Sequence, residues 1–217
     1  MRNLLAKEFR LSAFKLTYFF ILFACMTFLP GYPILMGCFF ICLGLFFTFQ
    51  MARESNDVLY SALLPIEKGD VVKARFLFVC IIQMAGFLLM VVFTWLRMSL
   101  LNGREPWASN VLMAANPLFL AFALLVFLLF NAVFVRGFYK TAYYYGRPFV
   151  WFIVTSFLVI LAAETLHFLP GLAFLNASAG PLMWVQYLAL ACALVLFAGG
   201  SCLAYRSARK SFEGLDL

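Results

Sequence analysis

Apolar residues occupy six long blocks of the chain, separated by short polar breaks. None of the blocks alternates polar and apolar positions as a transmembrane barrel strand does, and a helix satisfies all its backbone groups within one segment in lipid. With about 20 residues needed to cross a bilayer, the pattern predicts an all-α integral membrane protein with six transmembrane helices. The predicted spans are 16–29, 34–50, 76–96, 112–135, 149–166 and 182–205.

The composition supports this class and excludes a soluble one. Of the 217 residues, 66% are hydrophobic and only 12% are charged, whereas a soluble chain needs a largely polar surface. The apolar blocks recur from end to end, so we expect a single transmembrane domain covering residues 1–217.

The cations fall on one side of the predicted membrane. With both termini inside, all of the 16 Lys and Arg residues except Arg97 and Arg104 lie in terminal segments or loops of the same side. Basic residues of short loops stay on the cytoplasmic side, so we expect cytoplasmic termini in a bacterial plasma membrane. The net charge of +7 then reflects topology and contact with anionic membrane lipid, and no nucleic-acid partner is expected.

The first fifteen residues predict an amphipathic helix lying along the cytoplasmic interface. Helical spacing puts Lys7 and Arg10 on one side and Leu5 and Phe9 toward the other, while Glu8 falls among the apolar positions. A charged cytoplasmic extension of the first span is the alternative.

Signatures of catalysis are scarce. No glycine precedes a lysine, so the chain lacks a phosphate-binding P-loop, and its three aspartates, Asp57, Asp70 and Asp216, all lie in predicted cytoplasmic segments. Glu164 and His167 share a helix face near the outer end of span five, where they form an interfacial polar pair or serve substrate or proton passage. A metal site would need further ligands. We therefore expect no enzyme and no cofactor in this chain.

Three polar side chains interrupt the spans. Gln83, Asn131 and Gln186 either hydrogen-bond between helices or line a substrate path. Glycines at several span positions offer places where helices approach closely.

The longest polar passage, ESNDVLYSALLPIEKGDVVKAR (54–75), follows the second span. Asn56 or Asp57 can cap a short helix, and Pro65 ends it. Its apolar face must be covered by lipid or by a cytoplasmic partner; the apolar positions are Val58, Leu59, Ala62 and Leu63.

Three features together resemble permease subunits of type-2 ATP-binding cassette exporters, particularly small six-span bacterial subunits such as the phenol-soluble modulin exporters. They are the opening LLAKEFRL, the ARESNDVLYSALLPIEKGDVVKAR passage and the six-span layout. The resemblance covers essentially the whole chain. Glu67-Lys68-Gly69 departs from it, because relatives often carry a polar-basic pair there.

The resemblance implies that 1–15 is an interfacial connecting helix and that the helix within 54–75 is a coupling helix seated on a separate cytoplasmic ATPase, which binds ATP and Mg. It also implies a second permease chain, forming a homodimer that exports amphipathic peptides, including antimicrobial ones, or other hydrophobic compounds. The implied coupling residues are Glu54, Asp57, Val58, Leu59, Leu63, Pro65 and Arg75. The rival hypotheses are a membrane scaffold that binds a partner through the same loop without transport, and an intramembrane enzyme using Glu164 and His167.

Overall fold

The computed structural model describes residues 2–57, 60, 67–101, 103–107, 110–141 and 144–214, and every regular element within these ranges is helical. The elements are α1 (Arg2–Lys7), η1 (Glu8–Ser12), α2 (Lys15–Phe20), η2 (Ile21–Phe28), α3 (Met36–Glu54), α5 (Lys68–Leu96), η3 (Arg97–Leu101), α6 (Pro117–Leu129), η4 (Phe130–Val135), α7 (Arg136–Lys140), α8 (Gly146–Leu166), η5 (Ala173–Asn176) and α9 (Met183–Glu213).

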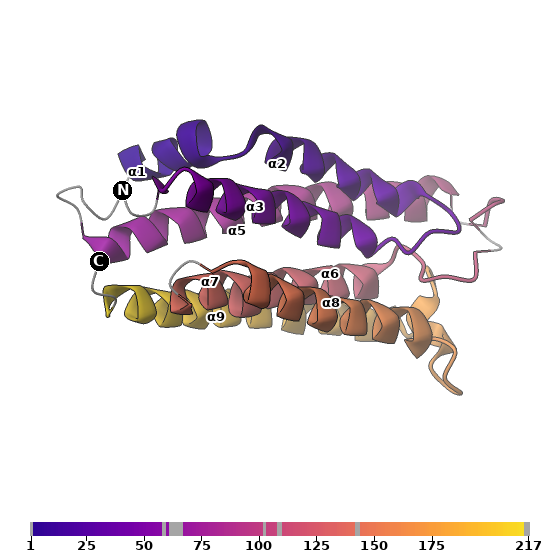
Figure 1. Ribbon diagram of the computed structural model, residues 1–217. Helices are drawn as coiled ribbons and strands as arrows, with labels where there is room; N and C mark the ends of the chain where they lie inside the picture. The colour runs from indigo at the N-terminus through magenta and orange to yellow at the C-terminus, as the bar shows by residue number, and fades with distance from the viewer. Residues whose placement is uncertain are drawn as a thin grey trace.

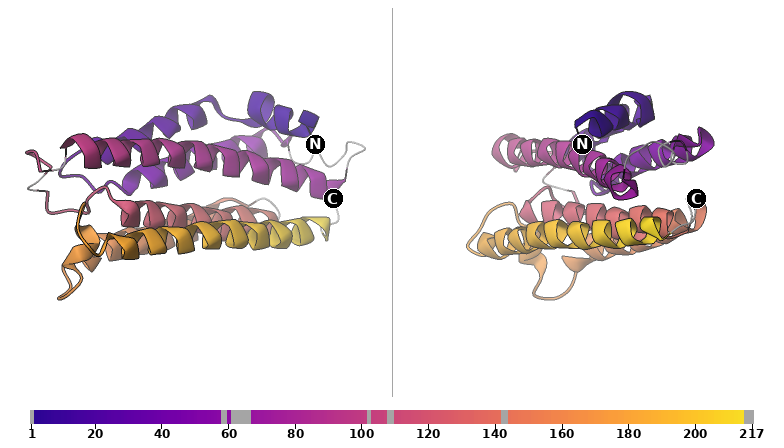
Figure 2. Two further views of the ribbon diagram at one scale, coloured as in Figure 1. Left: turned by 180° about the vertical axis from the view of Figure 1, so that it is seen from behind. Right: turned by 90° about the vertical axis from the view of Figure 1, so that its left-hand side faces the viewer.

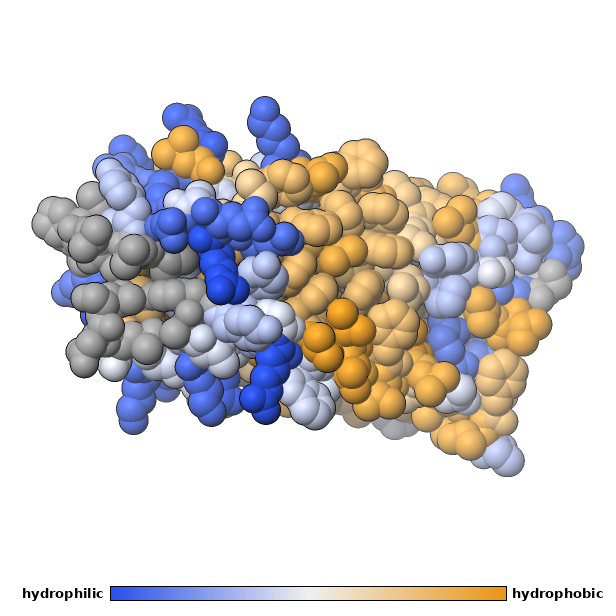
Figure 3. Space-filling view, in the orientation of Figure 1, coloured by the Kyte–Doolittle hydropathy of each residue, from blue (hydrophilic) through white to orange (hydrophobic). Residues whose placement is uncertain are grey.

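Among the described residues, five helices are long and apolar enough to cross a membrane, and the number rises to six when one bent pair is counted as a span. The five are α3, α5 with η3, the continuous run α6–η4–α7, α8 and α9. An apolar belt crosses the middle of the visible surface between two polar ends (Figure 3). The predicted all-α membrane architecture is therefore confirmed.

The bent pair is the N-terminal segment. The helix 2–12 and the helix 15–28 meet at 92°. The second is short, but its last eight residues form a 3-10 helix, which rises about 2.0 Å per residue against about 1.5 Å in an α-helix. Six α-helical and eight 3-10 residues reach about 25 Å, close to the roughly 30 Å of a hydrocarbon core. The 3-10 stretch lengthens a short span.

The predicted fourth span begins too early. Residues 112–116 are not helical, and α6 begins at Pro117 after the N-cap Asn116, whose side-chain oxygen accepts a hydrogen bond from the Phe119 N–H. Proline favours the first position of a helix because its missing N–H is not needed there. The Asn-Pro pair, rather than the apolar run, sets the helix start.

The helices form two layers of roughly aligned rods (Figures 1 and 2). One layer holds α2–η2, α3 and α5, with α1 and η1 on its outer side, and the other holds α6–η4–α7, α8 and α9. Across the boundary α5 packs against α9 and α3 against α6. Both chain ends lie at the same end of the bundle, beside the last turn of α3 and the first turn of α5 (Figure 1).

Small residues allow the close approaches. A Cβ atom on Gly44 of α3 would lie 2.6 Å from Cβ of Phe20, and the Thr17 hydroxyl donates a 2.6 Å hydrogen bond to the Gly44 carbonyl. The expected close helix contacts are confirmed at this glycine and at Gly86 and Gly200, whereas Gly199 has nothing within 4 Å. Glycine and threonine bring helix backbones together where lipid supplies no hydrophobic drive.

Candidate functional site

The end of α3 reverses the chain through a left-handed residue. The Ser55 N–H bonds the Met51 carbonyl, and Asn56 has φ of 53°. Asparagine tolerates this region better than most residues and commonly ends helices. The Tyr60 N–H then bonds the Asn56 carbonyl at 2.9 Å. This turn places Asp57 at the end of the bundle, next to α5.

A cluster of four charged side chains surrounds that position. The Arg75 guanidinium donates from Nε to Glu8 Oε2 at 2.6 Å and from Nη2 to Glu8 Oε1 at 3.1 Å. Nη2 also reaches Asp57 Oδ2 at 2.6 Å, and the other carboxylate oxygen of Asp57 lies 2.6 Å from Lys7 Nζ. We call Lys7, Glu8, Asp57 and Arg75 the Arg75 cluster.

The Arg75–Glu8 pair of the cluster is buried, Lys7 and Asp57 are partly exposed, and the cluster is balanced in charge. Arg75 is 1% exposed and Glu8 2% exposed, and two cations face two carboxylates. Charges this deep persist only when paired, because removal from water costs several kcal/mol per ion. The guanidinium also lies 5.7 Å from the centre of the Phe49 ring on α3. The cluster thereby joins the N-terminal helix, α3, the segment after α3, and α5.

Two opposing effects act on Asp57. Burial raises the pKa of its carboxyl, but the charges of Arg75 and Lys7 and their hydrogen bonds outweigh burial, so the pKa falls below its ordinary value of 3.8. The Ser12 hydroxyl adds a hydrogen bond to Oδ2 at 3.2 Å. The site therefore holds Asp57 ionised at neutral pH.

Among the other implied coupling residues, the structure describes Glu54, which lies outside the Arg75 cluster. Glu54 is exposed and accepts a hydrogen bond from Gln50 Nε2 one turn earlier. Val58, Leu59, Leu63 and Pro65 fall outside the described residues, so their role in coupling stays a prediction.

Gln83 and Asn131 form a reciprocal pair at the centre of the bundle. Gln83 Nε2 donates to Asn131 Oδ1 at 3.1 Å, and Asn131 Nδ2 donates to Gln83 Oε1 at 3.0 Å and to Ser201 Oγ at 3.0 Å. Both amides are fully buried. Their bonds link α5, η4 and α9. Any place for them in a substrate path stays a prediction.

Gln186, Glu164 and His167 lie at the opposite end of the bundle, and each binds backbone. Gln186 Nε2 donates to the carbonyls of Phe174 and Ala177. Glu164 Oε2 accepts from the Met113 N–H at 2.8 Å, and His167 Nε2 lies 3.1 Å from the Val111 carbonyl oxygen. Both side chains of the Glu164–His167 pair therefore hold the segment that leads into α6.

Sequence reasoning missed Glu8 and Lys7 as site residues. The signal was present in the amphipathic pattern, where Glu8 interrupts the apolar side of the N-terminal helix. A charge on a face that must be buried requires a partner, but periodicity alone does not reveal a partner 67 positions away.

Comparison with known proteins identifies the family. No curated protein and no solved structure matches the chain significantly. A family model described as ABC-2 family transporter protein matches residues 3–205, which is most of the chain. The helices that can cross a membrane fit that description. The chain therefore belongs to the ABC-2 family of transporter proteins, as a multi-pass membrane permease component of an ABC transporter whose ATPase activity lies in a separate subunit.

Proposed function

We propose that this chain is the permease subunit of an ABC exporter, in which two copies form the path for amphipathic peptides or other hydrophobic compounds. ATP and Mg are bound by the separate ATPase. The observation that carries the proposal is the Arg75 cluster, which joins the segment after α3 to α5 and to the N-terminal helix by ion pairs centred on the buried Arg75.

Orientation is argued from charge. The bundle end that holds both termini also holds all the basic residues except Arg97 and Arg104. Under the positive-inside rule this end faces the cytoplasm, where an ATPase is available. The 92° bend between the helices 2–12 and 15–28 suits an N-terminal helix that lies along the membrane surface while the second helix enters it.

The cluster offers a mechanical link between a partner and the spans. A partner that moves the segment 54–67 also moves Asp57. The ion pairs of Asp57 transmit that movement to Arg75 in α5 and to Lys7 in the N-terminal helix. Packed elements joined by ion pairs move as one body more readily than they deform. ATP-driven approach of two ATPases would thus tilt α3 and α5 together.

The test is co-purification in detergent with the ATPase encoded nearest to this gene, with ATP hydrolysis recorded in the eluate. We compare the native chain with Leu59→Asp, which places a charge in the predicted ATPase contact. The matched control is Val111→Asp, which puts the same charge on an exposed apolar residue at the opposite end of the bundle.

We expect the native chain and Val111→Asp to retain the ATPase, and Leu59→Asp to lose it or to uncouple hydrolysis from transport. If no ATPase elutes with any form, coupling through this segment is wrong. If a cytoplasmic partner without ATP turnover elutes instead, the chain acts as a scaffold.

A further inference from the structure

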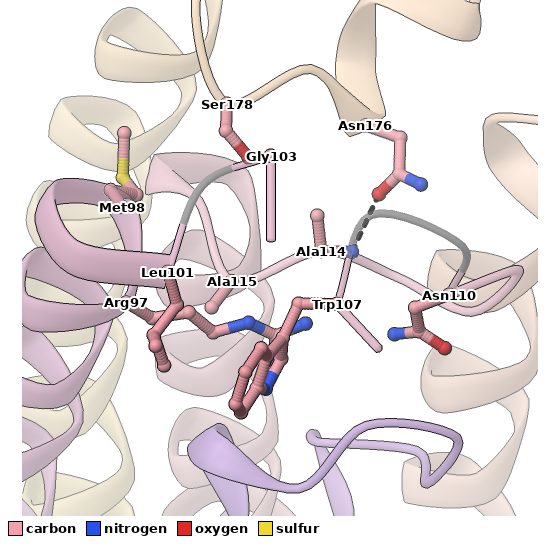
Figure 4. Close-up of a pocket in the computed structure, with 10 residues that line it drawn as sticks. All are labelled: Arg97, Met98, Leu101, Gly103, Trp107, Asn110, Ala114, Ala115, Asn176 and Ser178. Carbon is pink, nitrogen blue, oxygen red and sulfur yellow. Dashed lines mark hydrogen bonds between the residues drawn. The ribbon is translucent and has the colours of Figure 1, made fainter. Parts of the chain in front are cut away.

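A polar pocket of about 180 Å³ opens at the end of the bundle opposite the termini (Figure 4). It lies where the end of α5, the segment before α6 and the segment before α9 meet. None of its described lining residues is Asp or Glu. Its polar walls come from Arg97, Trp107, Asn110, Asn176 and Ser178.

Arg97 brings an unbalanced charge to the pocket. It is 6% exposed, and within the part of the chain that the structure describes it makes no ion pair. Nη1 donates to the Thr27 carbonyl at 2.7 Å, which satisfies one open carbonyl at the end of η2. The guanidinium has five N–H donors, and this is the one bond of its side chain among the described residues. Arg97 is thus a buried cation without a carboxylate partner among the described residues, whereas Arg75 pairs with two carboxylates.

Asn110 supplies a second free donor, and its orientation is fixed. Its Oδ1 accepts hydrogen bonds from the N–H groups of Gly31 at 3.2 Å and Leu112 at 3.3 Å. The amide nitrogen must therefore point the other way, and Figure 4 shows it turned toward the Arg97 side of the pocket. This Nδ2 atom is buried and has no hydrogen-bonding partner among the described residues.

Two further polar side chains of the pocket, Trp107 and Asn176, already have partners. Trp107 Nε1 donates to the Phe28 carbonyl at 2.9 Å, and Asn176 Oδ1 accepts from the Ala114 N–H at 2.6 Å. The hydrogen-bond donors that remain for a ligand are those of Arg97 and Asn110, together with the Ser178 hydroxyl. A buried donor without an acceptor, such as Asn110 Nδ2, costs free energy. A group with several acceptor oxygens and negative charge would accept a hydrogen bond from it and would also balance the charge of Arg97.

An apolar groove of about 610 Å³ adjoins the polar pocket, and the two share Met98 and Ser178 as walls. The groove runs between α5 and α9 over the start of α6. Two of its lining side chains, Trp95 and Tyr187, are exposed on the surface that faces lipid. The other apolar lining residues are Phe87, Val91, Pro117, Leu120, Ala179, Leu190 and Leu194.

We propose that the polar pocket and the apolar groove together bind one anionic phospholipid from the membrane leaflet at this end. Its phosphate accepts hydrogen bonds from Arg97 and Asn110 Nδ2, and an acyl chain lies in the groove. A free phosphate would match the donors but would leave the groove empty, whereas a lipid enters sideways from the bilayer and fills both. The site does not depend on the chain acting as an exporter.

The test uses the full-length chain, delipidated in a non-ionic detergent, with native mass spectrometry to count bound lipid. The probes are phosphatidylglycerol, phosphatidylcholine and inorganic phosphate. We expect saturable binding of one phosphatidylglycerol per chain, at least tenfold tighter than phosphatidylcholine. Tight binding of inorganic phosphate with no gain from the lipid would overturn the proposal.

Two variants and a control locate the site. Arg97→Gln removes the charge and should weaken phosphatidylglycerol binding at least tenfold. Arg104→Gln makes the same charge change seven residues later, just after η3, at an exposed residue outside the pocket, and should bind as the native chain does.

Asn110→Asp covers the case in which Arg97→Gln misfolds. The aspartate keeps the acceptor oxygen for Gly31 and Leu112 and places its second oxygen where the amide nitrogen was, so it becomes an internal counter-ion for Arg97. We expect its melting temperature to be equal to or above the native value while lipid binding is lost. Native lipid binding by both Arg97→Gln and Asn110→Asp would overturn the proposal.

Discussion

Arg75 on α5 holds both carboxylate oxygens of Glu8, 67 positions earlier in the chain, through Nε at 2.6 Å and Nη2 at 3.1 Å. The bond ties the N-terminal helix to the body of the bundle from inside the structure. Because both side chains are almost fully buried, the pair has no water to replace a lost partner.

Removing one partner should therefore be costly. We expect Glu8→Leu to lower the free energy of unfolding by about 3–5 kcal/mol, because Arg75 keeps its charge in a buried place. Thermal unfolding in detergent measures the change. The control Glu213→Gln breaks the exposed Arg209–Glu213 pair and should leave the melting temperature nearly unchanged, because exposed ion pairs contribute little to stability.

The double variant Glu8→Leu with Arg75→Leu separates charge from packing. It replaces the pair by apolar side chains, which is often neutral, and should recover much of the stability lost in Glu8→Leu. If the double variant melts below Glu8→Leu, the ion pair is not the reason for the loss.

Acid should loosen the cluster through Asp57. Its pKa is lower in the folded chain than the ordinary value of 3.8, since Arg75 and Lys7 outweigh the effect of burial. A group with a lowered folded pKa stabilises the fold fully above its unfolded pKa and loses this effect as the pH falls through the folded pKa. At neutral pH we expect Asp57→Asn to melt below the native chain.

The pH dependence gives the sharper measurement. The difference in melting temperature between native and Asp57→Asn should stay constant from pH 7 to about 5 and shrink as the pH drops below 3.8. Asp70→Asn, which changes the same chemical group outside the cluster, is the control. A difference that does not change with pH would exclude an electrostatic role for Asp57.

The membrane core offers a test of the amide network. Asn131→Leu removes one hydrogen-bonding partner from each of Gln83 and Ser201 at buried positions, while Gln83 Nε2 keeps its bond to the Phe127 carbonyl. We expect a loss of about 1–2 kcal/mol, in the range of hydrogen bonds between membrane helices. Thermal unfolding of Asn131→Leu, Gln83→Leu and the double variant checks this, because coupled residues should show a double effect smaller than the sum.

Hydropathy alone predicted the spans well where a helix lies wholly in lipid. The predicted 149–166 compares with α8 at Gly146–Leu166. Hydropathy does not mark the end of a helix whose polar turns continue beyond the membrane, because a hydropathy window detects only the apolar part of the helix. Thus α5 begins at Lys68 rather than at residue 76, and α9 continues to Glu213 rather than ending at residue 205.

The candidate site was less predictable than the fold. Asp57 and Arg75 could be proposed from a motif, since they lie in one polar passage. Glu8 and Lys7 could not be assigned to them, because their contact depends on the 92° bend at residues 13–14, which no periodicity encodes. The anion-binding pocket depends likewise on three separate segments that meet at the end of the bundle.

Glu164 gives a final prediction that distinguishes structure from chemistry. Its Oε2 accepts the Met113 N–H at 2.8 Å, and Asn176 Oδ1 accepts the next N–H, of Ala114, at 2.6 Å. Side chains thus supply the hydrogen-bonding partners that a helix or a sheet would otherwise give to these backbone N–H groups.

Glu164→Ala should speed amide hydrogen exchange at Met113 at least tenfold, whereas Glu164→Gln, which keeps an acceptor oxygen, should restore protection. An enzyme that used the carboxylate would instead lose its activity in both variants, because glutamine cannot exchange a proton as glutamate does. Native exchange at Met113 in Glu164→Ala would show that this carboxylate does not hold the segment.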